Sequence, residues 1–174
     1  AVILLVVAAA IIGACLLTKP GYKNVGTLDA EKLFALRTEY AGDNAAVSGI
    51  LDALGFRELG SSGADYGYAV HLSTDKEPMG ITVLYTYEGA VPRKSEERYR
   101  QIAMRGYIAL ALIDNAEWLR WEDIGAEGET PVSGTVYAGD YVAADYNAVR
   151  GSAAGLQALM DTLQACLEDG SIVY

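Results

Sequence analysis

An unbroken apolar stretch of 17 residues at the start of the sequence, AVILLVVAAAIIGACLL, most limits what this chain can fold into. It contains no charged and no strongly polar side chain. As an α-helix it would cover roughly 26 Å, close to the hydrocarbon thickness of a bilayer, which is about 30 Å. A helix of a soluble protein rarely stays apolar on every face over such a length, and a core strand is shorter. The sequence therefore predicts a transmembrane helix or anchor over residues 1–18, with a buried helix as the alternative.

Cys15 lies within this stretch and offers a second way to reach a membrane. The string IGAC, which ends at Cys15, resembles a bacterial lipobox, whose cysteine is lipidated after cleavage. Two leucines continue the apolar stretch beyond the cysteine, whereas a lipoprotein usually becomes polar there. Cys15 is therefore a candidate lipidation site, as an alternative to the transmembrane helix.

The rest of the chain is acidic and has the length of one ordinary domain. The formal net charge of −10, from 13 Lys and Arg against 23 Asp and Glu, lies entirely beyond the apolar stretch. A domain of this charge is repelled by nucleic acid, so we expect no nucleic-acid partner. A Lys-Pro-Gly sequence ends the first helix. Residues 19–31 are predicted to form a linker, and residues 32–174 a single domain.

Helices and strands are predicted to alternate in this domain. Each of three expected helices begins at a capping residue and carries apolar side chains at helical spacing. They span residues 43–54, 95–113 and 152–170. Strands are expected at residues 32–40, 66–73, 80–87, 117–121 and 132–137. We therefore expect an α+β fold, in which an antiparallel sheet packs against helices, preceded by one N-terminal transmembrane helix.

Two of these strands are predicted to pair as a hairpin in one particular register. If the numbers of paired residues sum to 153, Tyr66 faces Tyr87 and Tyr68 faces Tyr85, and every apolar or aromatic residue of one face lines up. A slip by one residue would destroy this match. The four tyrosines are therefore expected to pack across the strands beneath a helix, with a binding surface as the alternative reading.

The residues needed for common catalytic and metal sites are missing or badly spaced. The single histidine, His71, excludes two-histidine metal motifs and leaves a Ser-His-Asp triad without support. Ser73 and Lys76 have the SxxK spacing of penicillin-binding enzymes, but they enter a hairpin loop and the companion motifs are absent. Cys166 falls on a predicted helix. We therefore expect no enzymatic activity, no metal and no cofactor in this chain.

An acidic group follows the fourth predicted strand. It consists of Glu122, Asp123, Glu127 and Glu129. Their spacing does not match a calcium loop, in which oxygen ligands alternate around a glycine. We expect these carboxylates to lie in a solvated turn.

Aromatic residues supply the candidate binding surface. The chain has 12 tyrosines, and tyrosine combines rigid contact area with a polar tip, which suits recognition. The hairpin tyrosines are explained by packing, but the aromatic residues farther along the chain are freer to line a surface. The predicted surface for a ligand or partner comprises Trp118, Trp121, Tyr137 and Tyr141.

Three stretches together resemble a known bacterial domain: LFALRTEYAGDNAAVSGIL, LSTDKEPMGITVLY and ALALIDNAEWLRW. They are similar to an uncharacterised extracytoplasmic domain found after the last transmembrane helix of BlaR-type membrane metallopeptidases. The apolar run ending ACLLTKP looks like that last helix. The resemblance implies that the zinc peptidase lies upstream of Ala1 and that the globular part lies outside a bacterial cell membrane. No catalytic residue carries over, because none of the family's catalytic motif is present.

In the family that this chain resembles, an outer domain senses a signal and an inner peptidase cuts a repressor. We therefore expect a membrane-tethered extracytoplasmic sensor or interaction domain, held to the membrane through residues 1–18, for an unknown small ligand or protein partner. Two alternatives stay open, namely an anchored lipoprotein with a scaffolding role and a membrane-anchored hydrolase.

Overall fold

The computed structural model describes residues 22–60, 65–91, 96–140 and 146–169. Within these ranges no helix has both the length and the apolar character needed to cross a membrane. The predicted transmembrane helix at residues 1–18 and the candidate lipidation site Cys15 lie outside the described residues.

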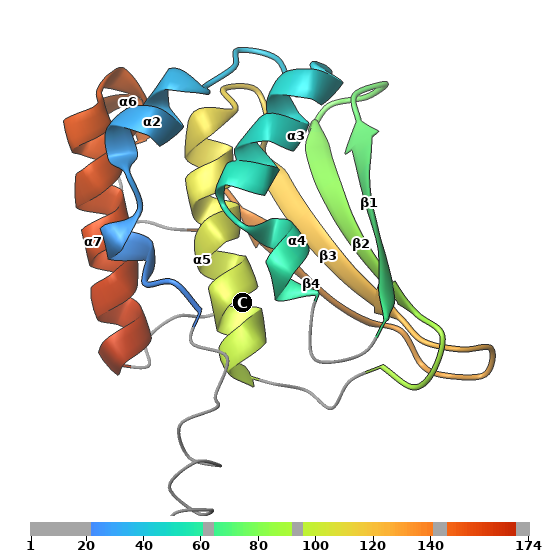
Figure 1. Ribbon diagram of the computed structural model, residues 1–174. Coiled ribbons are helices and arrows are strands. Elements are labelled where there is room, and N and C mark those ends of the chain that lie inside the picture. Colours follow the sequence, from blue (N-terminus) through green and yellow to red (C-terminus); the bar gives the residue numbers. More distant parts are fainter. Residues whose placement is uncertain (1–21, 61–64, 92–95, 141–145, 170–174) are drawn as a thin grey trace, which may run out of the picture.

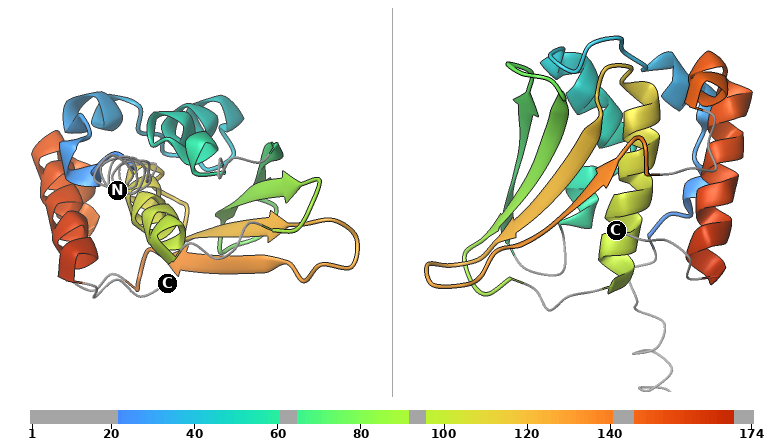
Figure 2. Two further views of the ribbon diagram at one scale, coloured as in Figure 1. Left: turned by 60° about the horizontal axis from the view of Figure 1, so that its bottom comes forward. Right: turned by 180° about the vertical axis from the view of Figure 1, so that it is seen from behind.

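A four-stranded sheet forms one side of the domain, and the helices lie on the other (Figures 1 and 2). The strands, in their spatial order, are β1 (Tyr66–Ser73), β2 (Gly80–Tyr87), β3 (Trp118–Ile124) and β4 (Val132–Tyr137). The long helix α5 (Glu96–Leu112) lies between this sheet and the C-terminal helix α7 (Ala153–Asp169) (Figure 1). The shorter helices are η1 (Val25–Thr27), α2 (Ala30–Ala35), α3 (Asn44–Ala53), α4 (Phe56–Leu59) and α6 (Tyr146–Gly151). The expected α+β class is confirmed.

The predicted hairpin register is confirmed along its whole length. β1 and β2 pair antiparallel, with Tyr66 opposite Tyr87 and Tyr68 opposite Tyr85. These tyrosines face the helices, whereas His71 is exposed on the other face of β1 and lies opposite Thr82, as predicted. Period-2 alternation on both strands determined this register, because only one alignment buries the whole aromatic face.

The expectation of a purely antiparallel sheet is wrong, because β2 and β3 run parallel. The helix α5 connects them and carries the chain back to the end of the sheet where β2 began. Parallel neighbours require such a crossover, and α5 is long enough to supply it. The remaining pair, β3 and β4, is antiparallel, so the sheet is mixed.

Capping residues mark the helix starts that the sequence predicted. The side chain of Asp43 accepts a hydrogen bond from the backbone N–H of Ala46 at 3.0 Å and begins α3. Ser152 Oγ likewise accepts from the N–H of Gly155 at 3.0 Å and begins α7. The predicted cap Ser95 of α5 lies outside the described residues.

The strand predicted at residues 32–40 is wrong. Asp29 accepts a hydrogen bond from the N–H of Lys32 at 3.1 Å and begins the helix α2, and only Thr38 makes an isolated bridge, with Ile113. The alternation in this stretch was partial, and the capping aspartate outweighed it. Part of the expected linker at 19–31 is also packed into the domain, since Val25 is fully buried.

Candidate functional site

The four aromatic residues predicted to form one binding surface are separated in the structure. Trp121 is 1% exposed, and its ring stacks on Tyr99 at a centroid distance of 6.4 Å. It therefore belongs to the core and not to a surface. Trp118 is three positions earlier on β3, which places it on the opposite face, because side chains alternate along a strand. Tyr141 lies outside the described residues.

Trp118 and Tyr137 do share the outer face of the sheet. They are directly paired across β3 and β4, and Tyr137 is 48% exposed. Trp118 is half-buried, because its ring covers Gly80 of β2 and its Nε1 donates to the carbonyl of Pro78 at 3.0 Å. Of the predicted surface, the described residues retain only this pair.

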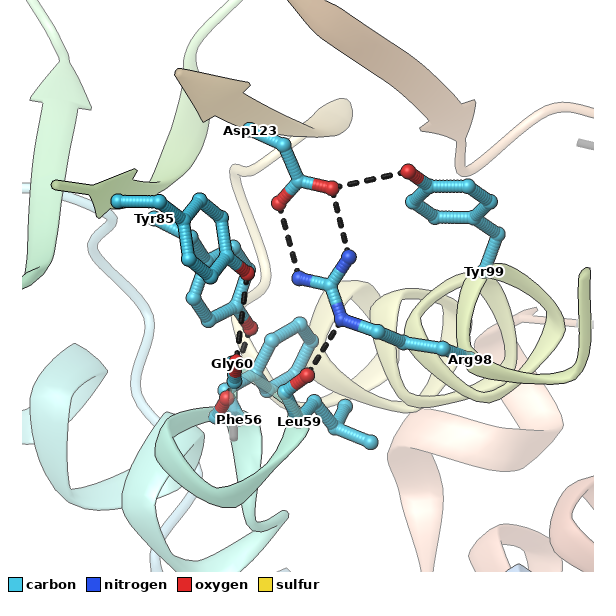
Figure 3. Close-up of polar contacts among 8 residues, drawn as sticks. Phe56, Leu59, Gly60, Tyr85, Arg98, Tyr99 and Asp123 are labelled. Carbon is cyan, nitrogen blue, oxygen red and sulfur yellow. Dashed lines mark hydrogen bonds and ion pairs between the residues drawn. The ribbon is translucent and has the colours of Figure 1, made fainter. Parts of the chain in front are cut away.

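A buried ion pair joins α5 to β3 on the inner face of the sheet (Figure 3). Arg98 donates through both terminal nitrogens to the two carboxylate oxygens of Asp123, at 2.6 and 2.9 Å. The hydroxyl of Tyr99 donates to the same carboxylate at 3.0 Å, and Arg98 Nε donates to the carbonyl of Leu59 at 2.5 Å. The expected position of Asp123 in a solvated turn is wrong, since it is fully buried in β3. Such a bidentate pair satisfies both charges and fixes the helix against the strand.

Tyrosine hydroxyls hold α4 in place beside this ion pair. Three hydroxyls donate to backbone carbonyls of α4 and its C-terminal end: Tyr66 to Arg57 at 2.6 Å, Tyr85 to Phe56 at 2.7 Å, and Tyr87 to Gly60 at 3.3 Å. Burial raises the pKa of Tyr87 to about 12, and it raises the pKa of Tyr85 well above its ordinary value. The predicted packing of these tyrosines beneath a helix is confirmed. These three hydroxyls serve the structure of the domain, since each already has an acceptor. The hydroxyl of Tyr68 is buried and has no hydrogen-bond partner among the described residues.

A second arginine, Arg105, is buried two turns farther along α5 and is only 4% exposed. Its Nε donates to the carbonyl of Leu54 at 2.8 Å, one terminal nitrogen bonds to Gln101, and the other donates to the carbonyl of Lys23 at 2.9 Å. All of these acceptors are neutral. Among the described residues no carboxylate lies within ion-pair distance of Arg105. Burial without a counter-ion lowers the pKa of Arg105 to about 10.

Arg105 lies at a pocket of about 510 Å³ between the N-terminal segment and the corner where α3 meets α4. This volume is within the range of small-molecule sites. The pocket is lined by Tyr22, Lys23, Leu28, Asp52, Ala53, Leu54, Gly55, Arg57, Glu58, Leu59, Tyr66 and Arg105. It combines apolar and aromatic side chains with five charged ones.

Sequence reasoning missed both arginines, although one signal for them was present. Arg98 and Arg105 are seven residues apart, which places them on the same face of a helix that is otherwise largely apolar. A charged residue on the buried face of a helix needs a polar partner, so this spacing marks a buried polar site. The partners themselves come from α4, β3 and residue 23, far apart in the sequence.

The described residues bring together no catalytic group that resembles a known reaction centre. His71 is exposed on the sheet, Ser73 ends a strand and does not start a helix, and Cys166 lies on α7. In the same part of the chain, no three His, Cys, Asp or Glu side chains are grouped so that they could hold a metal ion.

The fold and site define a single α+β domain with a small-molecule-sized pocket over a buried arginine. A family model, Domain of unknown function (DUF4825), matches residues 33–130, more than half of the chain, and the chain belongs to this family. The matched part includes both buried arginines, Asp123 and the α3–α4 corner. No curated protein and no solved structure matches the chain. The expected resemblance to an uncharacterised domain is thus confirmed, and its association with BlaR-type peptidases stays a prediction.

Proposed function

We propose that this chain is a membrane-tethered sensor domain that binds a ligand on the extracytoplasmic side of a bacterial membrane and has no catalytic activity of its own. One observation carries the proposal. The walls of the pocket come from two parts of the chain, first Tyr22, Lys23 and Leu28 and second the α3–α4 corner. The first wall follows directly on the apolar stretch that we expect to anchor the protein.

This placement suits a sensor, because a ligand in the pocket contacts the domain and the anchor-proximal segment at once. A ligand shifts a conformational equilibrium only if it binds one arrangement of its contacts better than another. Occupancy that changes how Lys23 is held to Arg105 on α5 would alter the connection to the membrane. Binding outside the cell would thus be transmitted along the chain.

The upstream partner we propose is a BlaR-type membrane metallopeptidase in the same polypeptide. The intact mass of the native protein, extracted from its own membranes, tests this. A mass far above the 18.5 kDa of this chain supports the proposal. A mass equal to residues 15–174 plus a lipid group on Cys15 would contradict it and would favour the anchored lipoprotein.

Membrane orientation can be tested by cysteine labelling of the full chain. Glu129 is exposed in the turn between β3 and β4, so Glu129→Cys with Cys15→Ala and Cys166→Ala presents one accessible thiol. A membrane-impermeant maleimide should label this variant in intact cells. Ala126→Cys, in the same turn and the same background, is the matched site and should behave identically. Labelling of both thiols only after permeabilisation would contradict extracytoplasmic placement.

A protein partner on the outer face of the sheet is the second candidate, favoured by the exposed ring of Tyr137 beside Trp118. Exposed aromatic side chains are enriched at interfaces. Crosslinking in native membranes with a photoreactive residue in place of Tyr137 tests it. If no adduct forms at residue 137 or at the neighbouring exposed position Ser133, this candidate fails.

A further inference from the structure

We infer that the pocket over Arg105 binds a small organic carboxylate with an apolar body, and that the ligand's carboxylate pairs with the Arg105 guanidinium. This inference rests on the proposed function, since it names the class of ligand that the sensor pocket takes. Three features of the site support it. Arg105 is buried without a carboxylate partner among the described residues, the residues lining the pocket carry a positive excess, and Arg105 holds the carbonyl of Lys23.

The two buried arginines differ in their partners. Arg98 has a carboxylate partner, whereas Arg105 is equally buried and bonds only to neutral oxygens. A buried charge is stabilised well only when it is paired. Arg105 lines the pocket, so a carboxylate arriving there would supply the missing partner.

The donors of Arg105 leave room for that carboxylate. A guanidinium carries five N–H groups. The contacts with Leu54, Gln101 and Lys23 occupy one group on Nε, two on the first terminal nitrogen and one on the second, that is, four in all. The fifth N–H has no acceptor among the described residues.

The charges around the pocket match a monoanion. Lys23, Arg57 and Arg105 carry three positive charges, and Asp52 and Glu58 carry two negative charges, which leaves one positive charge in excess. This positive excess at the pocket contrasts with the formal net charge of −10 of the chain. The two carboxylates would repel a doubly charged phosphate more strongly than a monocarboxylate. The apolar walls provide the contact area for the rest of the ligand.

Binding of a carboxylate would also compete with the carbonyl of Lys23. That carbonyl accepts from the second terminal nitrogen of Arg105 at 2.9 Å and holds the anchor-proximal segment onto α5. An ionised acceptor forms a stronger hydrogen bond to a guanidinium than a neutral carbonyl does. The ligand would therefore loosen residues 22–24, which gives the sensor a defined moving part, whereas Val25 is buried and Gly26 accepts a hydrogen bond from Gln157 on α7.

Ligand-observed NMR of the full chain in lipid nanodiscs tests the inference, with empty nanodiscs as the blank. The probes are 3-phenylpropionate, its alcohol analogue 3-phenylpropan-1-ol, and inorganic phosphate. We expect 3-phenylpropionate to bind at least about tenfold more tightly than the alcohol, because a carboxylate accepts a stronger hydrogen bond from a guanidinium than a hydroxyl does. We expect phosphate not to bind, because it lacks the apolar body and is repelled by the two carboxylates of the pocket. Hydrogen exchange at residues 22–24 should rise when the carboxylate binds.

Two variants locate the binding. Ala53 is exposed on α3 and lines the pocket, so Ala53→Trp should fill the pocket and abolish binding without disturbing the core. Ala45→Trp, at an exposed position on the same helix but away from the pocket, is the matched control and should bind as the wild type does. Arg105→Met should lose the preference for the carboxylate, and Arg105→Lys should retain part of it.

Each contrary result has its own meaning. Equal binding of carboxylate and alcohol, blocked by Ala53→Trp, would overturn the carboxylate assignment and leave the pocket as the sensor site. Binding of phosphate would show a general anion site and would likewise overturn it. No binding of 3-phenylpropionate to the wild type would also overturn it. Binding unaffected by Ala53→Trp would remove the pocket itself, and with it the observation that carries the proposed function.

Discussion

Arg98 and Arg105 lie two turns apart on the same face of α5, and each donates its Nε hydrogen to a backbone carbonyl at the C-terminal end of a neighbouring helix. Arg98 bonds to Leu59 at the end of α4, and Arg105 bonds to Leu54 at the end of α3. The two side chains thus fasten the same helical corner to the central helix. They differ in one respect, since only Arg98 has a carboxylate partner. Arginine therefore forms a complete ion pair at position 98. At position 105 it makes hydrogen bonds, within the described part of the chain, to neutral oxygens only.

This difference predicts losses of stability of different size when either charge is removed. Arg98→Met leaves Asp123 buried without a partner, so we expect the free energy of unfolding to fall by about 3–5 kcal/mol. Arg105→Met removes a charge that has no counter-ion, so its cost should be clearly smaller. Urea denaturation of the full chain in nanodiscs, followed by tryptophan fluorescence, measures both. A larger loss in Arg105→Met than in Arg98→Met would contradict the assignment of roles.

Removing Asp123 together with Arg98 tests the same ion pair. The double variant Arg98→Met/Asp123→Leu removes both charges, so it should recover most of the stability that Arg98→Met loses. If the double variant were as unstable as the sum of the two single variants, Arg98 and Asp123 would not be energetically coupled.

The three aromatic residues of the predicted surface that the structure describes should differ in their effect on stability. Trp121→Ala should cost about 3–5 kcal/mol, because the ring is fully buried. Trp118→Ala should cost less, since its ring is half-buried over Gly80. Tyr137→Ala should stay within about 0.5 kcal/mol of the wild type. The same urea titrations measure this series, and a Tyr137 effect as large as that of Trp121 would refute the assigned faces.

Gly134 is predicted to tolerate no side chain, because it lies opposite Trp121 on β4. A Cβ atom at this position would come within 2.1 Å of the buried indole ring. Gly134→Ala should therefore lower the free energy of unfolding by about 1–3 kcal/mol. Gly139→Ala, in the turn after β4 where a Cβ would meet nothing within 4 Å, is the matched control and should be nearly neutral. Equal thermal midpoints for the two variants would count against this packing.

Alkaline pH should destabilise the domain through its buried tyrosines. Burial raises the pKa of Tyr85 well above its ordinary value, and it raises the pKa of Tyr87 to about 12. The folded state therefore keeps protons that the unfolded state has lost. The stability contribution is complete below the unfolded pKa of about 10 and is lost as the pH rises toward the folded pKa.

Urea midpoints measured between about pH 8 and about pH 11 should accordingly fall above about pH 10. Tyr85→Phe removes one of the titrating groups and should flatten this fall, whatever its effect on stability at neutral pH. A fall of the same size in Tyr85→Phe and in the wild type would contradict the burial of this hydroxyl.

The outward placement of Trp118 and the inward placement of Trp121 could have been predicted from the sequence. Residues three apart on a strand point to opposite faces, so the two tryptophans were never able to form one surface once β3 was recognised as a strand. The seven-residue spacing of Arg98 and Arg105 was likewise visible. In both cases the side-chain periodicity within a single strand or helix is enough to predict which face each residue occupies.

The sequence by itself determined the features that depend on neighbouring residues. The start of α3 follows from the Asp43 cap, and the pairing of Tyr68 with Tyr85 follows from the alternation along two strands joined by a short loop. Tertiary structure alone decided that β3 lies parallel to β2, that Asp123 is buried against Arg98, and that the segment around Lys23 closes over Arg105. These contacts join residues far apart in the chain. Their free energy depends on what surrounds each charge after packing, and no local pattern records that environment.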